Sequence, residues 1–219
     1  MSMTPAQLLR GLAVVVVIVG WAALAHLSSA GDAPSDLGTA LGVAPIAAAL
    51  ALLLWRVRQP LLVAAGGLGL LAGLAALWPT LRQNVALLYF VQHLGTNLAL
   101  AALFGRTLFG QGEALVTQLA RAVFPAGISE RKRRYTRQVT IAWTVFFLSN
   151  ALLSAGLFLL APATVWSTFA NLLSLPLIGA MFIGEHLCRR RVLPPQERPT
   201  FAQAIRAYRL HNRPPANPL

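Results

Sequence analysis

The chain has 219 residues, of which 18 are Lys or Arg and 6 are Asp or Glu, so its formal net charge is +12. Only 11% of the residues are charged and 57% are apolar, whereas soluble domains carry about 25% charged residues. A water-soluble globule is therefore excluded. Collagen-like, coiled-coil and disordered chains are excluded too, because the sequence has neither their repeats nor their polarity.

Six apolar segments are long enough for a helix to cross a bilayer, which takes about 20 residues. They are 11–30, 37–55, 60–78, 85–104, 140–160 and 163–187. The sequence thus predicts an all-α, polytopic membrane protein with six transmembrane helices. Its four regions are an N-terminal transmembrane half at 1–104, a basic loop at 105–139, a transmembrane hairpin at 140–187 and a basic, Pro-rich tail at 188–219.

The positive charges between the spans predict the orientation of the chain. Of the 18 Lys and Arg residues, 17 lie before the first span, after the second and fourth, or after the sixth, and only Arg82 lies on the other side. By the positive-inside rule both termini are expected in the cytoplasm. Arg10, a short apolar run and Ser28-Ser29-Ala30 also fit a cleavable signal peptide, which would change only the place of the N-terminus.

Two short cytoplasmic helices are expected to lie on the membrane surface. In 113–124, apolar side chains recur on one helical face and polar ones on the other. The apolar face holds Leu115, Leu119 and Val123, and the polar face holds Thr117, Gln118 and Arg121. The tail repeats this pattern after Thr200, with Phe201, Ile205 and Tyr208 on one face.

A basic run follows the first of these helices and leads into the fifth span. Its residues are Arg131, Lys132, Arg133, Arg134 and Arg137. Such a run predicts a basic surface that attracts anionic lipid headgroups or an acidic protein. Nucleic acid is not expected as a partner, because basic runs between membrane anchors normally set topology.

Polar side chains gather in the last three spans. His93 and Asn97 lie one helical turn apart near the middle of the fourth span, Asn150 lies in the fifth and Asn171 in the sixth. Side chains this deep avoid lipid, so these four are expected to pack together, either as hydrogen bonds between helices or as a substrate or proton site. One histidine among amides is a poor metal site, and no metal is predicted.

Glu185 is the one Asp, Glu, Lys or Arg within the spans. Arg189 follows it at i+4, and Arg106 ends the fourth span at a similar depth. These three residues fit a structural ion pair or a clamp for an anionic headgroup or acyl substrate. Cys188, beside three arginines, is either a reactive thiol, a lipidation-like position or a small apolar residue. No catalytic motif occurs, so neither a catalytic residue nor a cofactor is predicted.

The second half of the chain resembles a known family. The residues that carry the resemblance are Phe104-Gly105-Arg106-Thr107-Leu108, Tyr135-Thr136-Arg137-Gln138-Val139-Thr140, Trp143, Phe146-Phe147, Asn150, Trp166, Phe169, Asn171, Gly184-Glu185 and Arg189-Arg190-Arg191. They are similar to small bacterial inner-membrane proteins encoded in gene clusters for aryl polyene and xanthomonadin-type pigment lipids. The resemblance covers about residues 104–195. Family members are sometimes labelled ketosynthase, but this chain has no thiolase-type domain with a nucleophilic Cys and two His.

The resemblance implies a role in aryl-polyene-type lipid biosynthesis at the bacterial inner membrane. The first hypothesis is a non-catalytic scaffold or lipid-handling component whose basic segments attract acidic acyl carrier proteins or biosynthetic enzymes. The same cations could instead bind anionic lipid, at about 1 kcal/mol each. The alternative is a membrane enzyme or flippase that acts on a lipid-linked acyl product through the polar cluster of spans four to six. A third possibility is that these spans form a purely structural oligomerisation module.

Overall fold

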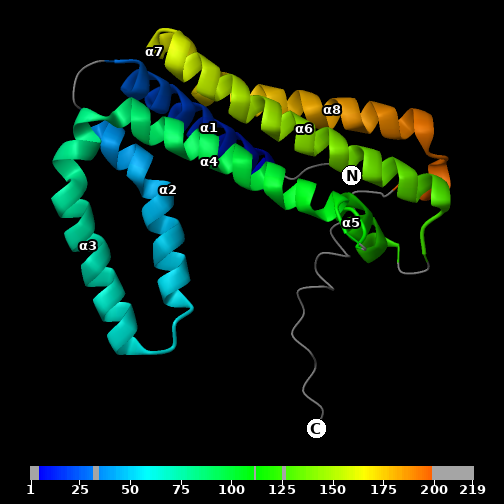
Figure 1. The fold of residues 1–219 in the computed structure, drawn as a ribbon, viewed down its shortest axis with the longest axis horizontal. Helices are drawn as coiled ribbons and strands as arrows, with labels where there is room; N and C mark the ends of the chain where they lie inside the picture. Colours follow the sequence, from blue (N-terminus) through cyan, green and yellow to red (C-terminus); the bar gives the residue numbers. More distant parts are fainter. Residues whose placement is uncertain (1–4, 32–34, 111, 125–126, 199–219) are drawn as a thin grey trace. The chain divides into compact units, whose positions relative to one another are not determined.

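A computed structural model describes residues 5–31, 35–110, 112–124 and 127–198, and throughout these ranges the ordered elements are helices (Figure 1). The elements are α1 (Pro5–Ala30), α2 (Asp36–Trp55), α3 (Pro60–Gln83), α4 (Val85–Gly105), the 3-10 turn η1 (Arg106–Leu108), α5 (Leu115–Val123), α6 (Glu130–Leu160), α7 (Ala163–Ser167), the π-helical segment η2 (Thr168–Leu173), α8 (Ser174–Val192) and the 3-10 turn η3 (Pro195–Glu197).

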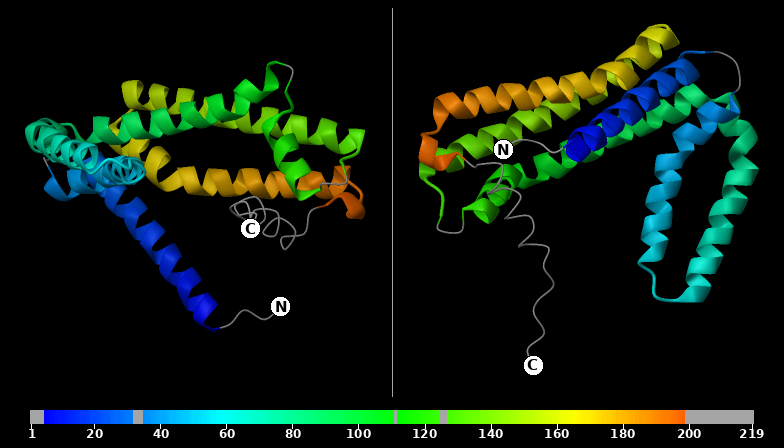
Figure 2. Two further views of the ribbon diagram at one scale, coloured as in Figure 1. Left: turned by 90° about the horizontal axis from the view of Figure 1, so that it is seen from below. Right: turned by 180° about the vertical axis from the view of Figure 1, so that it is seen from behind.

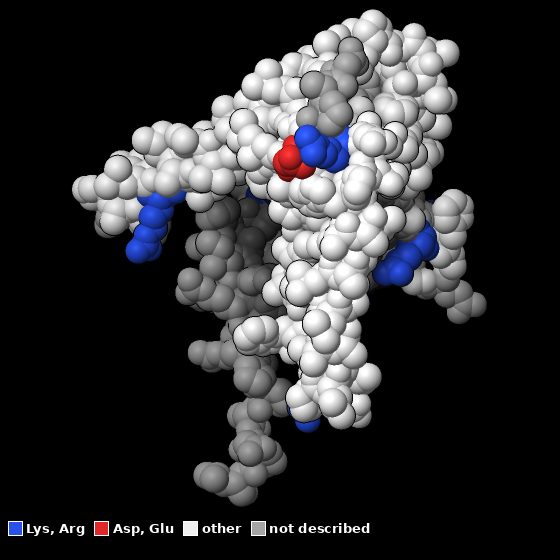
Figure 3. Space-filling model, turned by 90° about the vertical axis from the view of Figure 1, so that its left-hand side faces the viewer, with Lys and Arg blue, Asp and Glu red and all other residues white. Residues whose placement is uncertain are grey.

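The prediction of an all-α, multi-pass membrane protein is confirmed. Six helical stretches are long and apolar enough to cross a membrane, and each contains one of the six predicted segments. Most of the face drawn in Figure 3 carries no charged side chain, as expected of a surface that meets lipid. The chain is therefore an integral membrane protein with its outer surface in contact with the bilayer.

Several helices extend beyond the predicted spans: α1 begins at Pro5 rather than at residue 11, α3 ends at Gln83 rather than at 78, and α8 ends at Val192 rather than at 187. The fifth span was expected to begin at Thr140, but α6 begins at Glu130, so the basic run belongs to the helix itself. The sixth span is interrupted by six residues of π-helix between α7 and α8. The helix expected within 113–124 is present as α5, whereas the one expected at 201–208 lies outside the described residues.

The chain divides into two compact units. Unit 1 comprises Met1–Gly95 and Leu152–Pro176, and unit 2 comprises Thr96–Ala151 and Leu177–Leu219. Helices α4, α6 and α8 therefore contribute one part to each unit. Each unit has its own buried cluster of aromatic and small side chains.

Unit 1 is organised around Trp166, whose side chain is 0% exposed. Phe90 and Phe158 stack on each other with ring centroids 4.0 Å apart, and both meet the indole edge to face. Helix α1 packs on α7 and η2, and α2 packs on α3 as a hairpin (Figure 2). At Gly38 on α2 a Cβ atom would lie 2.6 Å from the Cβ of Ser28, so the close approach of α1 and α2 requires glycine there.

Unit 2 is organised around Trp143 on α6. Its indole packs against Phe104 from α4, Phe147 from its own helix and Phe182 from α8, with ring centroids 4.8 to 6.1 Å apart. Tyr135 and Val139 extend this core toward the first turns of α6. The core thus joins α4, α6 and α8. Tyr135, at the end of the core near the first turns of α6, also lines the site described next.

Candidate functional site

Hydroxyl groups hold the short helix α5 against α6. A helix leaves its first backbone N–H groups without partners, and the methyl side chain of Ala114 at the N-cap cannot accept hydrogen bonds from them. Thr107 Oγ1 accepts the N–H of Leu115 at 2.9 Å, and Thr140 Oγ1 accepts that of Val116 at 3.2 Å. These two threonines replace the missing cap and fix where α5 begins.

Thr117 departs from the predicted amphipathic pattern of α5. It was expected on the polar face, but its side chain is buried and its Oγ1 hydrogen-bonds Thr136 Oγ1 at 2.8 Å. The polar face therefore packs partly on α6. Leu119, on the predicted apolar face, is 59% exposed.

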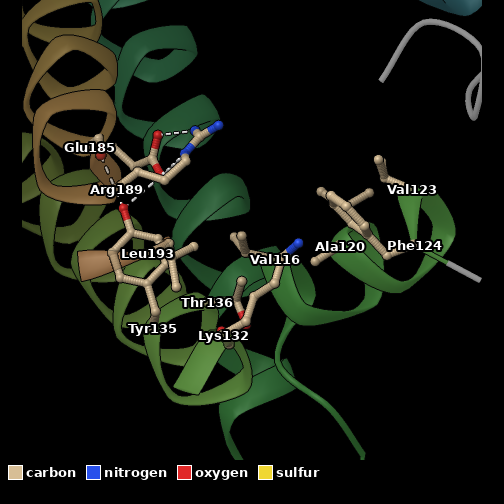
Figure 4. Close-up of a pocket in the computed structure, with 11 residues that line it drawn as sticks. Val116, Ala120, Val123, Phe124, Lys132, Tyr135, Thr136, Glu185, Arg189 and Leu193 are labelled. Atoms are coloured by element: carbon tan, nitrogen blue, oxygen red, sulfur yellow. Dashed lines mark hydrogen bonds and ion pairs between the residues drawn. The ribbon is translucent and has the colours of Figure 1, made fainter. Parts of the chain in front are cut away.

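A pocket of about 170 Å³ lies where α5, the beginning of α6 and the end of α8 meet (Figure 4). Helix α5 contributes a mostly aliphatic wall, with Val116, Leu119, Ala120 and Val123. The opposite walls carry the polar groups of the pocket. These are Lys132, Tyr135, Thr136, Glu185 and Arg189. An apolar pocket with a few converging polar groups is the usual form of a small-molecule site.

Lys132 differs from the other members of the predicted basic surface. Arg131, Arg133, Arg134 and Arg137 are exposed, but Lys132 is only 3% exposed. Its Nζ lies 3.1 Å from the centroid of the Phe124 ring, a cation–π contact. The prediction that Lys132 belongs to a basic surface is wrong, because its position on α6 turns it toward α5 and the pocket.

Glu185 and Arg189 form the ion pair that their spacing predicts. The carboxylate accepts bonds from the Arg189 guanidinium at both oxygens, and the Tyr135 hydroxyl donates to Glu185 Oε1 at 2.9 Å. The Glu185 side chain is 9% exposed. Arg106, the third member of the proposed clamp, forms no ion pair with any described residue and lies in η1.

Four exposed arginines on the first turns of α6 form what we call the arginine patch. They are Arg131, Arg133, Arg134 and Arg137. Three of them line a depression of about 260 Å³ together with Glu113 and Glu130, and Arg131 and Arg134 line a second one of about 370 Å³. The patch is thus one continuous basic surface with two shallow hollows.

Two carboxylates, which the sequence did not single out, pair with arginines in and beside this patch. Glu130 accepts bonds from Arg133 at 2.7 Å and Arg134 at 3.1 Å. Glu113 accepts bonds from Arg121 at 2.5 and 2.6 Å, and these bonds hold the pKa of Glu113 below its usual value. Four arginines against Glu130 leave a net charge of +3 on the patch.

His93 is bonded through both ring nitrogens. Nδ1 lies 3.0 Å from Ser154 Oγ, and Nε2 lies 3.0 Å from Ser174 Oγ. Trp166 Nε1 donates to Ser154 Oγ, and the Ser174 hydroxyl donates to the carbonyl of Ala170 at 2.8 Å. Every donor is satisfied if Ser154 donates to Nδ1 and Nε2–H donates to Ser174. His93 thus links α4 to Ser154 on α6 and to Ser174 on α8.

Asn171 belongs to a second buried network of unit 1. Its Nδ2 donates to Ser29 Oγ at 2.9 Å, and Ser29 donates to Ser167 Oγ at 3.1 Å. His26 Nδ1 lies 2.6 Å from the same Ser167 Oγ. His26, Ser29 and Ser167 were not singled out in the sequence, although a histidine within the first apolar span is itself a signal that a polar partner exists.

The four residues of the predicted polar cluster divide between the units. His93 and Asn171 belong to unit 1, and Asn97 and Asn150 belong to unit 2. Asn150 Nδ2 donates to the carbonyl of Phe146, one turn earlier on its own helix. Within unit 1 the structure pairs His93 with Ser154 and Ser174, and Asn171 with Ser29, and the sequence had not singled out these serines.

No group of three or more His, Cys, Asp or Glu side chains that could hold a metal ion occurs in the described part of the chain. Cys188 is exposed on α8. No protein-family model, curated protein or solved structure matches the chain.

Proposed function

We propose that the chain is a non-catalytic component of aryl-polyene-type lipid biosynthesis in the bacterial inner membrane, and that the arginine patch faces the cytoplasm and holds an acidic acyl carrier protein. The observation that carries the proposal is the patch itself, with a net charge of +3 beside a membrane-spanning helix. A surface of this kind attracts an acidic protein over a distance set by the salt concentration.

Two further features support a docking role. The patch stays accessible to a partner: Glu130 neutralises one charge of the four, and the paired side chains of Arg133 and Arg134 remain 55% and 77% exposed. The patch is also held rigidly, because α6 continues into the Trp143 core. The pathway assignment rests on the resemblance of residues 104–195 to the aryl polyene family, whose matching side chains include Tyr135, Trp143 and Glu185.

The proposal is tested by measuring the affinity of a purified acyl carrier protein from an aryl polyene pathway for the chain in phosphatidylcholine nanodiscs. The double variant Arg134→Gln/Arg137→Gln is expected to bind about tenfold more weakly at low salt, from about 1.4 kcal/mol of lost attraction. Arg56→Gln/Arg58→Gln removes the same charge from the turn between α2 and α3 and is the matched control.

Binding by the wild type is expected to weaken steeply between about 0.05 and 0.5 M salt, because screening shortens the reach of the patch. Equal affinities for the two double variants would contradict the proposal, and so would the absence of binding by the wild type at low salt. If the carrier protein does not bind, and only discs that contain anionic lipid associate with the patch, the arginines serve lipid headgroups alone.

A further inference from the structure

We propose that the pocket between α5, α6 and α8 binds a single-chain carboxylate, with its head at the Lys132 ammonium and its first carbons against α5. This site is separate from the arginine patch and goes beyond carrier binding. The inference starts from the position of Lys132, which lines the pocket, is 3% exposed and turns its amine toward α5 (Figure 4).

The Lys132 ammonium has no carboxylate in direct contact within the described structure. No described carboxylate forms an ion pair with its Nζ, and its one described close contact is with the ring of Phe124. The Glu197 carboxylate, which accepts a hydrogen bond from the hydroxyl of Ser129 at 2.9 Å, attracts the ammonium without forming an ion pair with it. A buried ammonium is costly unless an anion neutralises it, so the pocket favours a ligand that brings one.

The other charged groups of the pocket are already neutralised. Glu185 is bonded to Arg189 and to the Tyr135 hydroxyl, so this pair contributes no net charge. Lys132, Glu185 and Arg189 together give the pocket a charge of +1. It is therefore complementary to a monovalent anion.

The volume of the pocket selects the type of anion. A cavity of about 150 Å³ holds one benzene molecule, so 170 Å³ accommodates a carboxylate head and the first few carbons of its chain. A glycerophospholipid headgroup with two chains is too bulky to bring its phosphate to a lysine that is 3% exposed. A carboxylate on one chain fits, and the rest of that chain can leave past Leu119, which is 59% exposed on α5.

The test is equilibrium binding of radiolabelled dodecanoate to the chain in phosphatidylcholine nanodiscs, with empty discs as the background. Lys132→Met keeps an unbranched side chain and removes the charge. Its affinity for dodecanoate is therefore expected to fall by at least about tenfold. Arg131→Met removes a charge from the neighbouring exposed residue and is expected to leave dodecanoate binding unchanged.

Dodecanol separates the role of the head from that of the chain. It is expected to bind the wild type about tenfold more weakly than dodecanoate, and Lys132→Met should not change its affinity. Ala120→Phe fills the pocket from α5 and is expected to weaken the binding of both probes. Equal dodecanoate affinities for the wild type and Lys132→Met, or equal affinities of the wild type for dodecanoate and dodecanol, would overturn the proposal.

The two proposals fail independently. Lys132→Met leaves the arginine patch intact, so it is expected to bind the acyl carrier protein with wild-type affinity. Arg134→Gln/Arg137→Gln leaves the pocket intact and is expected to bind dodecanoate with wild-type affinity. If Lys132→Met binds dodecanoate as tightly as the wild type, the pocket proposal is wrong. If Arg134→Gln/Arg137→Gln binds the carrier protein as tightly as Arg56→Gln/Arg58→Gln does, the docking proposal is wrong.

Discussion

Replacement of Trp166 by alanine is expected to lower the free energy of unfolding by about 3 to 5 kcal/mol. The indole is fully buried, contacts the stacked rings of Phe90 and Phe158, and donates a hydrogen bond to Ser154. Its removal leaves a cavity in the core of unit 1 and frees the hydroxyl that faces His93. Loss of packing contacts is costly in a membrane protein too, since helix association there depends on them.

Thermal unfolding of the purified protein in one detergent, followed by size-exclusion chromatography, measures this effect. Trp55→Ala is the matched control, because the Trp55 side chain is 88% exposed at the end of α2. Its effect is expected to stay within about 0.5 kcal/mol. Similar losses in both variants would show that Trp166 is not the centre of unit 1.

Replacement of Glu185 by glutamine is expected to cost about 2 to 3 kcal/mol. The change leaves the Arg189 guanidinium, 30% exposed, without its carboxylate, while the Tyr135 hydroxyl keeps an oxygen acceptor. Breaking a largely buried pair from one side is costlier than removing both charges. The double variant Glu185→Gln/Arg189→Met is therefore expected to recover part of the loss.

Glu130→Gln is the control for this ion pair. Glu130 bridges Arg133 and Arg134 but its side chain is 52% exposed, so its loss is expected to cost less than about 1 kcal/mol. Chemical denaturation in mixed micelles compares the variants. The structural role of Glu185 is contradicted if Glu185→Gln and Glu130→Gln unfold at the same denaturant concentration.

The spans could be predicted from the sequence because a bilayer allows few alternatives. Backbone groups in lipid must bond within their own segment, so a run such as 37–55 forms a helix whatever its neighbours are. The prediction ends at Trp55, and so does α2. The π-helical segment could not be predicted, since one extra residue in a turn leaves the apolar composition of 163–187 unchanged.

Lys132 could have been placed correctly from the sequence. If the helix is extended back to Glu130, then Lys132, Tyr135, Thr136 and Val139 fall at i, i+3, i+4 and i+7, the spacing of one buried face. The predicted fifth span stopped short of the charged residues before Thr140, although a helix can continue beyond the lipid. The role of Phe124 was beyond reach, because the contact depends on how α5 folds back onto α6.

The pairing of histidines with serines also depended on the tertiary structure. Ser154 and Ser174 were unremarkable in sequence, since serines are common in packed transmembrane helices. Their role follows only from the approach of α4 to the later helices within unit 1, which places His93 between them. The sequence indicated that His93 needed partners but did not indicate which residues supply them.

The proposed role requires the arginine patch to face the cytoplasm, and one labelling experiment tests this directly. The chain has a single cysteine, so Cys188→Ser gives a background without thiols. Gln196→Cys, exposed in η3 of unit 2, and Thr80→Cys, exposed on α3 near Arg82, are then treated with a membrane-impermeant maleimide. We predict that in intact bacterial cells only Thr80→Cys is labelled, and that Gln196→Cys reacts once the inner membrane is permeabilised. Labelling of Gln196→Cys in intact cells would contradict the account, because no cytoplasmic carrier protein could then reach the patch.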